Sequence, residues 1–259
     1  MAYETLLVEI GDNFIGSITL NRPQNFNTFN TTLALELDQA LKCLDADPEV
    51  RVILIKGVGK NFCAGIDVSE LSGKTAMELR EWIQHMEEPL ITISRMAKPV
   101  IAQVQGVAAA NGAGLVAACD LAIAADNAKL GLTAINVGLN CVGPIIPVSR
   151  SVGRKIALEM LLYGDLIGSQ EALGRGLINR VVPATDLDKE ALEWASVLAR
   201  KSPIAVQIAK TGFYEAEDMG YYQAFGHMNE VFTRLCTTQD AKEGVCAFME
   251  KRQPVWSRH

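Results

Sequence analysis

Short apolar runs alternate with helix-like stretches through the first 150 residues, and this alternation constrains the fold more than any other feature. Each run is rich in Val, Ile, Leu or Ala and ends at a turn-forming residue, as buried strands do. These runs cover residues 16–23, 50–57, 98–106 and 120–126. Between the first two, leucines recur at 33, 37, 41 and 44, a helical stripe. The pattern therefore predicts an α/β chain.

The helical stretches also suggest how the chain is divided. The stretch 76–88 is expected to form a helix that Pro89 ends, because proline lacks the backbone N–H that a helix needs. From about residue 150 onward nearly everything has helical periodicity. We expect a β/α core over residues 1–200 that holds any ligand pocket. The apolar helices of residues 201–259 are expected to pack against a neighbouring subunit.

Composition excludes several classes of function. The formal net charge is −6 and no Lys/Arg cluster compensates it, so we expect no nucleic-acid partner. No apolar run reaches about 18 residues, and the first residues do not resemble a signal peptide, so we expect no membrane contact. Six cysteines without a C-x-x-C pair, and only three histidines, argue against a zinc site. Free thiols suit a reducing compartment, so we expect a cytoplasmic protein.

Two glycine- and alanine-rich turns carry the first indication of chemistry. The sequence "AAANGAGLVAACD" covers residues 108–120, and "KNFCAGIDVSEL" covers residues 60–71. Each turn leads into a stretch that can begin a helix. The backbone N–H groups in the first turn of a helix have no partner within the helix, so they favour a negatively charged group of a ligand. Two such turns facing each other would offer two N–H donors to one carbonyl oxygen, which is an oxyanion hole. The same residues are also compatible with tight packing turns that have no chemical role.

A set of segments in a fixed order resembles the crotonase superfamily, also called the enoyl-CoA hydratase/isomerase family. These segments are "LNRPQNFNTFN", "FCAGIDVSEL", "KPVIAQVQGVAAANGAGLVAACDLAIAAD", "LTAINVGL", "GLINRVVP" and "AFMEKRQPVW". The resemblance implies a spiral of ββα turns over residues 1–200. It also implies that the helices of residues 201–259 drive assembly into homotrimers, which can pair into hexamers.

The same resemblance implies a ligand and its binding residues. The ligand would be an acyl-CoA thioester, a substrate, with no further cofactor and no metal. The backbone N–H groups of Ile66 and Asn111 would hold its carbonyl oxygen. The CoA portion would run along the segment Ala64, Gly65, Ile66 and Asp67. Arg22 would lie near CoA and Lys251 would meet a CoA phosphate, although both are equally compatible with solvated surface charges.

Two positions depart from the family pattern. Hydratases of the family carry one glutamate three residues after the second amide donor and another in a later motif. Here these positions are Gly114 and Ala134. Neither residue can activate water or protonate a carbon atom, so ordinary hydration of an enoyl-CoA is not expected. The zone 140–147 also lacks the aspartate of dehalogenase-like members.

Four other residues are the remaining catalytic candidates near the inferred pocket. His85 and Glu87 belong to a helix that would lie over the acyl group as a lid and that also offers Glu88, and Asn140 and Cys141 lie a few residues after Ala134. A polar helix of this kind is also typical of a solvated surface. The chain further resembles enoyl-CoA hydratase domain-containing proteins that lack the usual glutamates. The alternatives to an enoyl-CoA enzyme are a non-catalytic acyl-CoA-binding oligomer, or another enolate reaction such as thioester hydrolysis, decarboxylation or C–C cleavage.

Overall fold

Two β-sheets form the framework of the computed structural model, which describes residues 3–257. The larger sheet has β1 and β2 antiparallel and every later neighbour parallel. Its order is β1 (Leu6–Ile10), β2 (Ile15–Leu20), β3 (Val52–Gly57), β4 (Val100–Val104), β6 (Leu121–Ala125) and β9 (Arg180–Val182). A smaller sheet contains β5 (Val107–Ala109), β7 (Lys129–Gly131) and β8 (Ile167–Gly168). The predicted α/β class is confirmed.

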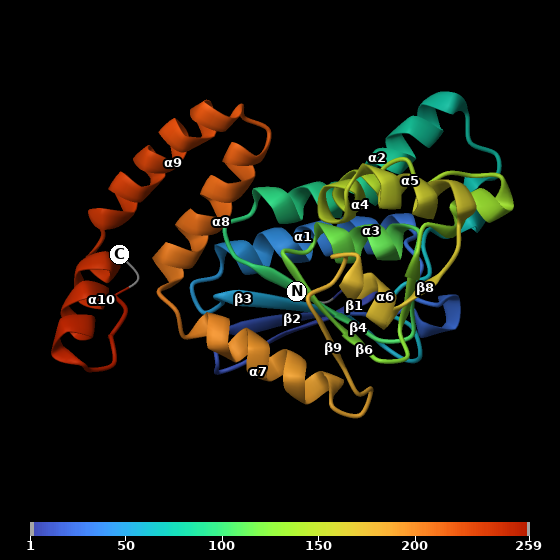
Figure 1. The fold of residues 1–259 in the computed structure, drawn as a ribbon. Helices are drawn as coiled ribbons and strands as arrows, with labels where there is room; N and C mark the ends of the chain where they lie inside the picture. The colour runs from blue at the N-terminus through green and yellow to red at the C-terminus, as the bar shows by residue number, and fades with distance from the viewer. Residues whose placement is uncertain (1–2, 258–259) are drawn as a thin grey trace.

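Helices cover both faces of the larger sheet (Figure 1). On one face, α1 (Thr31–Ala46) and α3 (Asn111–Ala118) contact the strands, and α2 (Ala76–Arg95) packs on both helices. On the other face lies α7 (Leu187–Ala199). The remaining helices are α4 (Ile145–Val152), α5 (Arg154–Tyr163), α6 (Ser169–Gly174), α8 (Pro203–Glu217), α9 (Tyr221–Cys236) and α10 (Gln239–Glu250). Three 3-10 helices are η1 (Pro23–Asn25), η2 (Val68–Leu71) and η3 (Thr133–Val137).

Helix α1 forms as its leucine stripe predicts. All four leucines of the stripe are buried against the sheet and α2. The Asn30 side chain accepts a hydrogen bond from the Leu33 N–H and caps the first turn. At the other end, the Lys98 ammonium donates to the Leu44 carbonyl at 2.7 Å, which satisfies an orphan acceptor of the last turn.

The prediction that Pro89 ends the second helix is wrong. Helix α2 continues through Pro89 to Arg95. An interior proline costs a helix about 3 kcal/mol, but the turns after it bury Leu90 and Ile93 in the core. Burying each such side chain contributes about 1.5–3 kcal/mol. Tertiary packing therefore outweighs the local cost of the proline.

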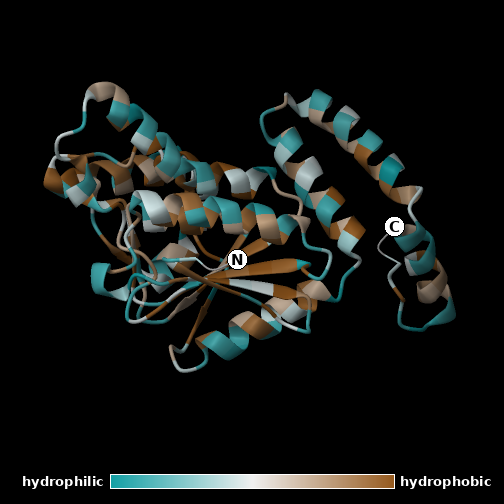
Figure 2. Cartoon of the chain, turned by 180° about the vertical axis from the view of Figure 1, so that it is seen from behind, coloured by the Kyte–Doolittle hydropathy of each residue, from teal (hydrophilic) through white to brown (hydrophobic). Residues whose placement is uncertain are grey.

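The C-terminal helices extend away from the sheet, with α9 and α10 farthest from it (Figure 1). Figure 2 shows hydrophobic residues concentrated in the strands but also spread along these outer helices. Large apolar side chains exposed there include Phe213, Tyr221, Tyr222, Phe225, Phe232, Phe248 and Met249. Within residues 3–257, no helix combines the length and the hydrophobicity needed to cross a bilayer.

A buried ionic cluster attaches α8 to the core. The Asp120 carboxylate accepts hydrogen bonds from the Lys210 ammonium at 2.8 Å, the Tyr214 hydroxyl at 3.0 Å and the Val100 N–H at 2.7 Å. The Lys210 ammonium also donates to the Lys98 carbonyl at 2.8 Å. Because these groups satisfy one another, the cluster fixes the position of α8 relative to β4 and α3.

Candidate active site

The two glycine- and alanine-rich turns lie directly against each other. The Cys63 N–H donates to the Val107 carbonyl at 3.1 Å, and the Ala109 N–H donates to the Cys63 carbonyl at 2.9 Å. A methyl group on Gly112 would lie only 2.0 Å from that same Cys63 oxygen. Glycine is therefore required at 112 because the backbone of the first turn occupies the space of a side chain.

The first turn leaves the amide of Ile66 without a partner. The residues on either side are engaged, because the Phe29 N–H donates to the Gly65 carbonyl at 2.8 Å and the Asp67 N–H donates to the Phe29 carbonyl at 2.7 Å. The Ile66 N–H itself finds no acceptor among the described residues. Gly65 has φ +119°, a conformation that side chains rarely permit. This backbone turn is what presents the Ile66 amide.

The second turn presents the amide of Asn111, the first residue of α3. Asn111 has no acceptor for its backbone N–H within residues 3–257. The residue before it, Ala110, has φ 48° and ψ −115°, which is strained for an alanine. The Ala110 N–H is held by the Gly131 carbonyl at 2.8 Å. The sequence gives no signal for this strain, because alanine ordinarily avoids positive φ.

Packing occupies the position where the family pattern has its first glutamate. A methyl group on Gly114 would lie 2.7 Å from Cβ of Pro144 and 3.2 Å from a methyl carbon of Leu90. Pro144 and Leu90 are both buried. A longer side chain at 114 therefore cannot point this way without displacing α4 or α2. Sequence reasoning missed Pro144, since its contact with Gly114 is purely tertiary.

Glu87 lies close to the second turn. The Asn111 side-chain amide donates to the carbonyl of Met86, the residue before Glu87, at 3.1 Å. A methyl group on Gly143 would lie 2.0 Å from a Glu87 carboxylate oxygen, so this carboxylate rests on the backbone of the Gly143–Pro144 turn. Partial burial raises the pKa of Glu87. The described residues include no hydrogen-bond or ion-pair partner for it.

The three other catalytic candidates occupy different surroundings. His85 precedes Glu87 by two residues and so points away from the face that Glu87 occupies. Asn140 is exposed. Cys141 is buried beside Ala134, its thiol is hydrogen-bonded to the Ala134 backbone, and burial raises the pKa of the thiol. A thiol in this state is a poor nucleophile at neutral pH.

Arg22 lies beside the segment expected to hold CoA, but it is already paired. Its guanidinium donates to the Asp67 carboxylate at 2.9 Å and to the Thr28 carbonyl at 2.5 Å. Hydrogen bonds from Ser69 and Arg22 hold the pKa of Asp67 below its usual range. Ala64 is fixed by its N–H, which donates to the Phe26 carbonyl at 3.1 Å.

Lys251 is not brought to this site within one chain. It follows the last residue of α10, and α10 lies well away from α3, the helix that begins at Asn111 (Figure 1). A role for Lys251 at this site therefore requires a second subunit.

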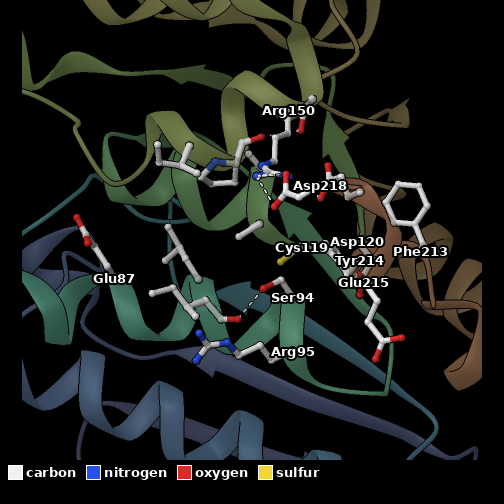
Figure 3. Close-up of a pocket in the computed structure, with 18 of the residues that line it drawn as sticks. Glu87, Ser94, Arg95, Cys119, Asp120, Arg150, Phe213, Tyr214, Glu215 and Asp218 are labelled. Carbon is white, nitrogen blue, oxygen red and sulfur yellow. Dashed lines mark hydrogen bonds and ion pairs between the residues drawn. The ribbon is translucent and has the colours of Figure 1, made fainter. Parts of the chain in front are cut away.

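A cavity of about 740 Å³ extends from Glu87 between α2 and α4 to α8. Glu87 lies at one end, Phe213 and Tyr214 lie at the other, and Cys119 lies between them (Figure 3). Much of the wall is apolar, with Leu90, Ile91, Ile146 and Pro147 among its side chains. The cavity has the size and the mixed lining that small-molecule sites have.

A helix-covered α/β framework with two contacting amide-bearing turns is the architecture of the crotonase class. The sequence model of the enoyl-CoA hydratase/isomerase family matches residues 11–259, and the chain belongs to this family.

Its relatives include the mitochondrial enoyl-CoA hydratase domain-containing protein 3 of Rattus norvegicus, 35% identical over 94% of this chain and 81% of the relative. A probable enoyl-CoA hydratase of Mycobacterium tuberculosis is 35% identical over 99% of each chain. The crystal structure of an enoyl-CoA hydratase from Mycobacterium smegmatis superimposes with a TM-score of 0.94 at 36% identity, covering 97% of this chain and 98% of that one. Human enoyl Coenzyme A hydratase domain-containing protein 3 gives a TM-score of 0.94 at 33% identity, covering 98% and 100%. The resemblance seen in the sequence is thereby confirmed.

Proposed function

We propose that the protein binds an acyl-CoA thioester and stabilises negative charge on its carbonyl oxygen with the backbone N–H groups of Ile66 and Asn111. One observation carries this proposal: two backbone amides that find no acceptor within residues 3–257 stand on two turns that touch through Cys63 and Gly112. The strained backbone of Ala110 also supports the proposal. Such conformations persist only where the surrounding structure enforces them, and they cluster at active sites and ligand-binding sites. The start of α3 adds a favourable dipole for an anion.

The CoA portion is assigned to the segment Ala64 to Asp67. Arg22 supports this segment through its ion pair with Asp67, so its role is to hold the turn rather than to contact a phosphate. The acyl chain is assigned to the part of the cavity between α2 and α4, where Leu90, Ile91 and Ile146 form the wall. Lys251 is assigned to a CoA phosphate only across a subunit boundary.

We also propose a homotrimer, or a pair of trimers, formed through α8, α9 and α10. The apolar side chains exposed on these helices support it, because monomeric proteins rarely leave so much apolar surface in contact with water. Light scattering should give a multiple of the 28.1 kDa monomer mass. A stable monomer at micromolar concentration would contradict the assembly.

A cytoplasmic location is also proposed. The six cysteines support it, because all of them are free thiols.

Ordinary hydration is not the proposed activity. It needs one group to hold water against the β-carbon and another to deliver a proton to the α-carbon. Gly114 and Ala134 provide neither. The absence of acids at Gly114 and Ala134 also favours a second candidate function, which is acyl-CoA binding without turnover. Thioester hydrolysis, decarboxylation or C–C cleavage would need an acid or base from elsewhere in the site.

Thermal unfolding with a panel of acyl-CoAs tests the binding site. A ligand that binds only the folded state stabilises it by about 2.7 kcal/mol at a hundredfold excess over its Kd. The matched control is an S-alkyl-CoA thioether of the same length, which has no carbonyl oxygen. The thioester should stabilise the protein more than the thioether does. Equal stabilisation by the two compounds, or none by either, would refute the proposed role of Ile66 and Asn111.

A further inference from the structure

Helix α2 is joined by hydrogen bonds to both of the segments that present the backbone amides. The Trp82 indole N–H donates to the Glu70 carboxylate at 2.8 Å, and Glu70 follows Ile66 by four residues. The Asn111 side-chain amide donates to the Met86 carbonyl at 3.1 Å. Trp82 and Met86 are four residues apart, so they lie on the same face of α2. One turn of α2 therefore links the two segments.

The backbone between Ile66 and Glu70 is a compact turn. Residues Val68–Leu71 form the 3-10 helix η2, and Asp67 caps its start. The Asp67 carboxylate accepts hydrogen bonds from the Ser69 N–H at 3.3 Å and from the Ser69 hydroxyl at 2.6 Å. The Glu70 N–H donates to the Asp67 carbonyl at 3.1 Å. Because these bonds fix the backbone from Asp67 to Glu70, a displacement of Glu70 also moves the Ile66 amide.

The Glu70 carboxylate fastens the same turn to the start of α1. Its Oε2 atom accepts hydrogen bonds from the Thr31 N–H at 2.9 Å and from the Thr31 hydroxyl at 2.8 Å. The unpaired N–H groups of the first turn of a helix favour such a carboxylate. Phe29, two residues before Thr31, forms a parallel β-bridge with Ile66. Capping of α1 accounts for the bonds from Thr31, but it does not account for the bond from Trp82.

The two linking residues of α2 are held firmly. Trp82 and Met86 are both buried, so water does not compete for their polar groups. The indole N–H is the one polar group of the Trp82 side chain, and a buried indole N–H usually finds a partner. A hydrogen bond to a charged acceptor such as Glu70 is stronger than one between neutral groups. Further along α2, Leu90 and Ile93 anchor the helix in the core.

We infer that α2 sets the spacing of the two amides, and that Trp82 and Glu70 are positioning residues that act through the amide of Ile66. The inference rests on the proposed acyl-CoA site. One carbonyl oxygen binds two N–H groups well only when both donors reach it within hydrogen-bond distance and in line. Loosening either link to α2 should therefore weaken binding of the thioester carbonyl. Binding of the rest of the ligand should stay unchanged.

Calorimetric titration with hexanoyl-CoA and with the thioether S-hexyl-CoA provides the test. Both compounds carry the CoA portion and only the thioester has a carbonyl oxygen, so the ratio of their Kd values reports on the two amides alone. Trp82→Phe keeps a large apolar ring and removes the indole N–H. It should reduce the preference for the thioester about tenfold, equivalent to about 1.4 kcal/mol. Asn111→Leu, which keeps the backbone N–H and removes the second link, should reduce the preference in the same direction.

Trp194→Phe is the matched control, because it makes the same substitution in α7 on the other face of the sheet (Figure 1). It should leave the preference unchanged. Glu70→Gln keeps the size of the side chain but removes the charge, which weakens the bond from Trp82. It should also reduce the preference, and its effect should not add fully to that of Trp82→Phe, because both changes act on one bond.

The outcomes separate this inference from the proposed function. Wild-type protein that prefers the thioester, together with an undiminished preference in Trp82→Phe, Glu70→Gln and Asn111→Leu, would overturn the inference and leave the proposed function standing. Lower melting temperatures in these variants without a change in the ratio would have the same meaning, because they would show a purely structural role. Equal Kd values for the two compounds in wild-type protein would overturn both.

Discussion

Adding one methyl group at Gly112 should separate the two turns of the site. In Gly112→Ala, the new carbon would lie 2.0 Å from the Cys63 carbonyl oxygen, where ordinary contact begins at 3.4 Å. The turns must therefore move apart by about 1.4 Å. The obstacle is backbone, so no change of rotamer can relieve it.

The expected loss of stability follows from three contributions. Overpacking of this kind costs about 1–3 kcal/mol. The same displacement strains the hydrogen bond from the Ala109 N–H to the Cys63 carbonyl, which is worth about 0.5–1.5 kcal/mol. Replacing glycine by alanine in a helix returns about 0.5–1 kcal/mol. The free energy of unfolding of Gly112→Ala should therefore fall by about 0.5–4 kcal/mol.

Urea denaturation measures this change as a lower midpoint at an unchanged slope. Gly174→Ala is the control, because a methyl group at the end of α6 meets nothing within 4 Å. Gly112→Ala should also lose most of its thermal response to acyl-CoA, since the Ile66 and Asn111 amides no longer converge. If Gly112→Ala matched Gly174→Ala in stability and kept the full ligand response, the geometric reasoning about the two turns would be wrong.

Three further predictions concern the missing acids, the buried ion pair and acid stability. Wild-type protein should hydrate crotonyl-CoA far more slowly than the ~10 s⁻¹ of a median enzyme. Gly114→Glu combined with Ala134→Glu should not rescue this rate and should lower the melting temperature, because the buried proline beside Gly114 leaves no room; a gain in hydratase activity would contradict this. Asp120→Asn should cost about 3–5 kcal/mol in urea denaturation, because it leaves the buried Lys210 ammonium without its counter-charge. Adding Lys210→Met should recover part of that loss, and a single variant as stable as wild type would show that the pair contributes nothing. The folded-state pKa of Asp67 is lowered, so its stabilisation is fully present above its unfolded pKa of about 3.9 and is lost as pH falls through the folded value. The melting temperature of wild type should therefore fall more steeply below about pH 4 than that of Asp67→Asn, and parallel curves would refute this.

Local pattern in the sequence was sufficient for much of the framework. The leucine stripe of α1 and the apolar run of β3 were predictable because side-chain periodicity depends only on neighbouring residues. The bare turns at 63–66 and 108–112 were recognisable for a related reason, since glycine and alanine mark places where another group approaches the backbone. The loss of acids at Gly114 and Ala134 is also visible in the sequence alone.

Contacts between distant residues decided the rest of the site. Helix α2 continues through Pro89 because Leu90 and Ile93 reach the core, and no local rule includes that gain. Tertiary packing also places Glu87 against the Gly143–Pro144 turn, 56 positions further along the chain. The sequence could name Glu87 as a candidate but could not distinguish it from a solvated surface acid. Only the packing of α2 against α3 and against the turn before α4 determines its desolvation and the absence of a partner within residues 3–257, because both depend on which atoms surround the carboxylate in three dimensions.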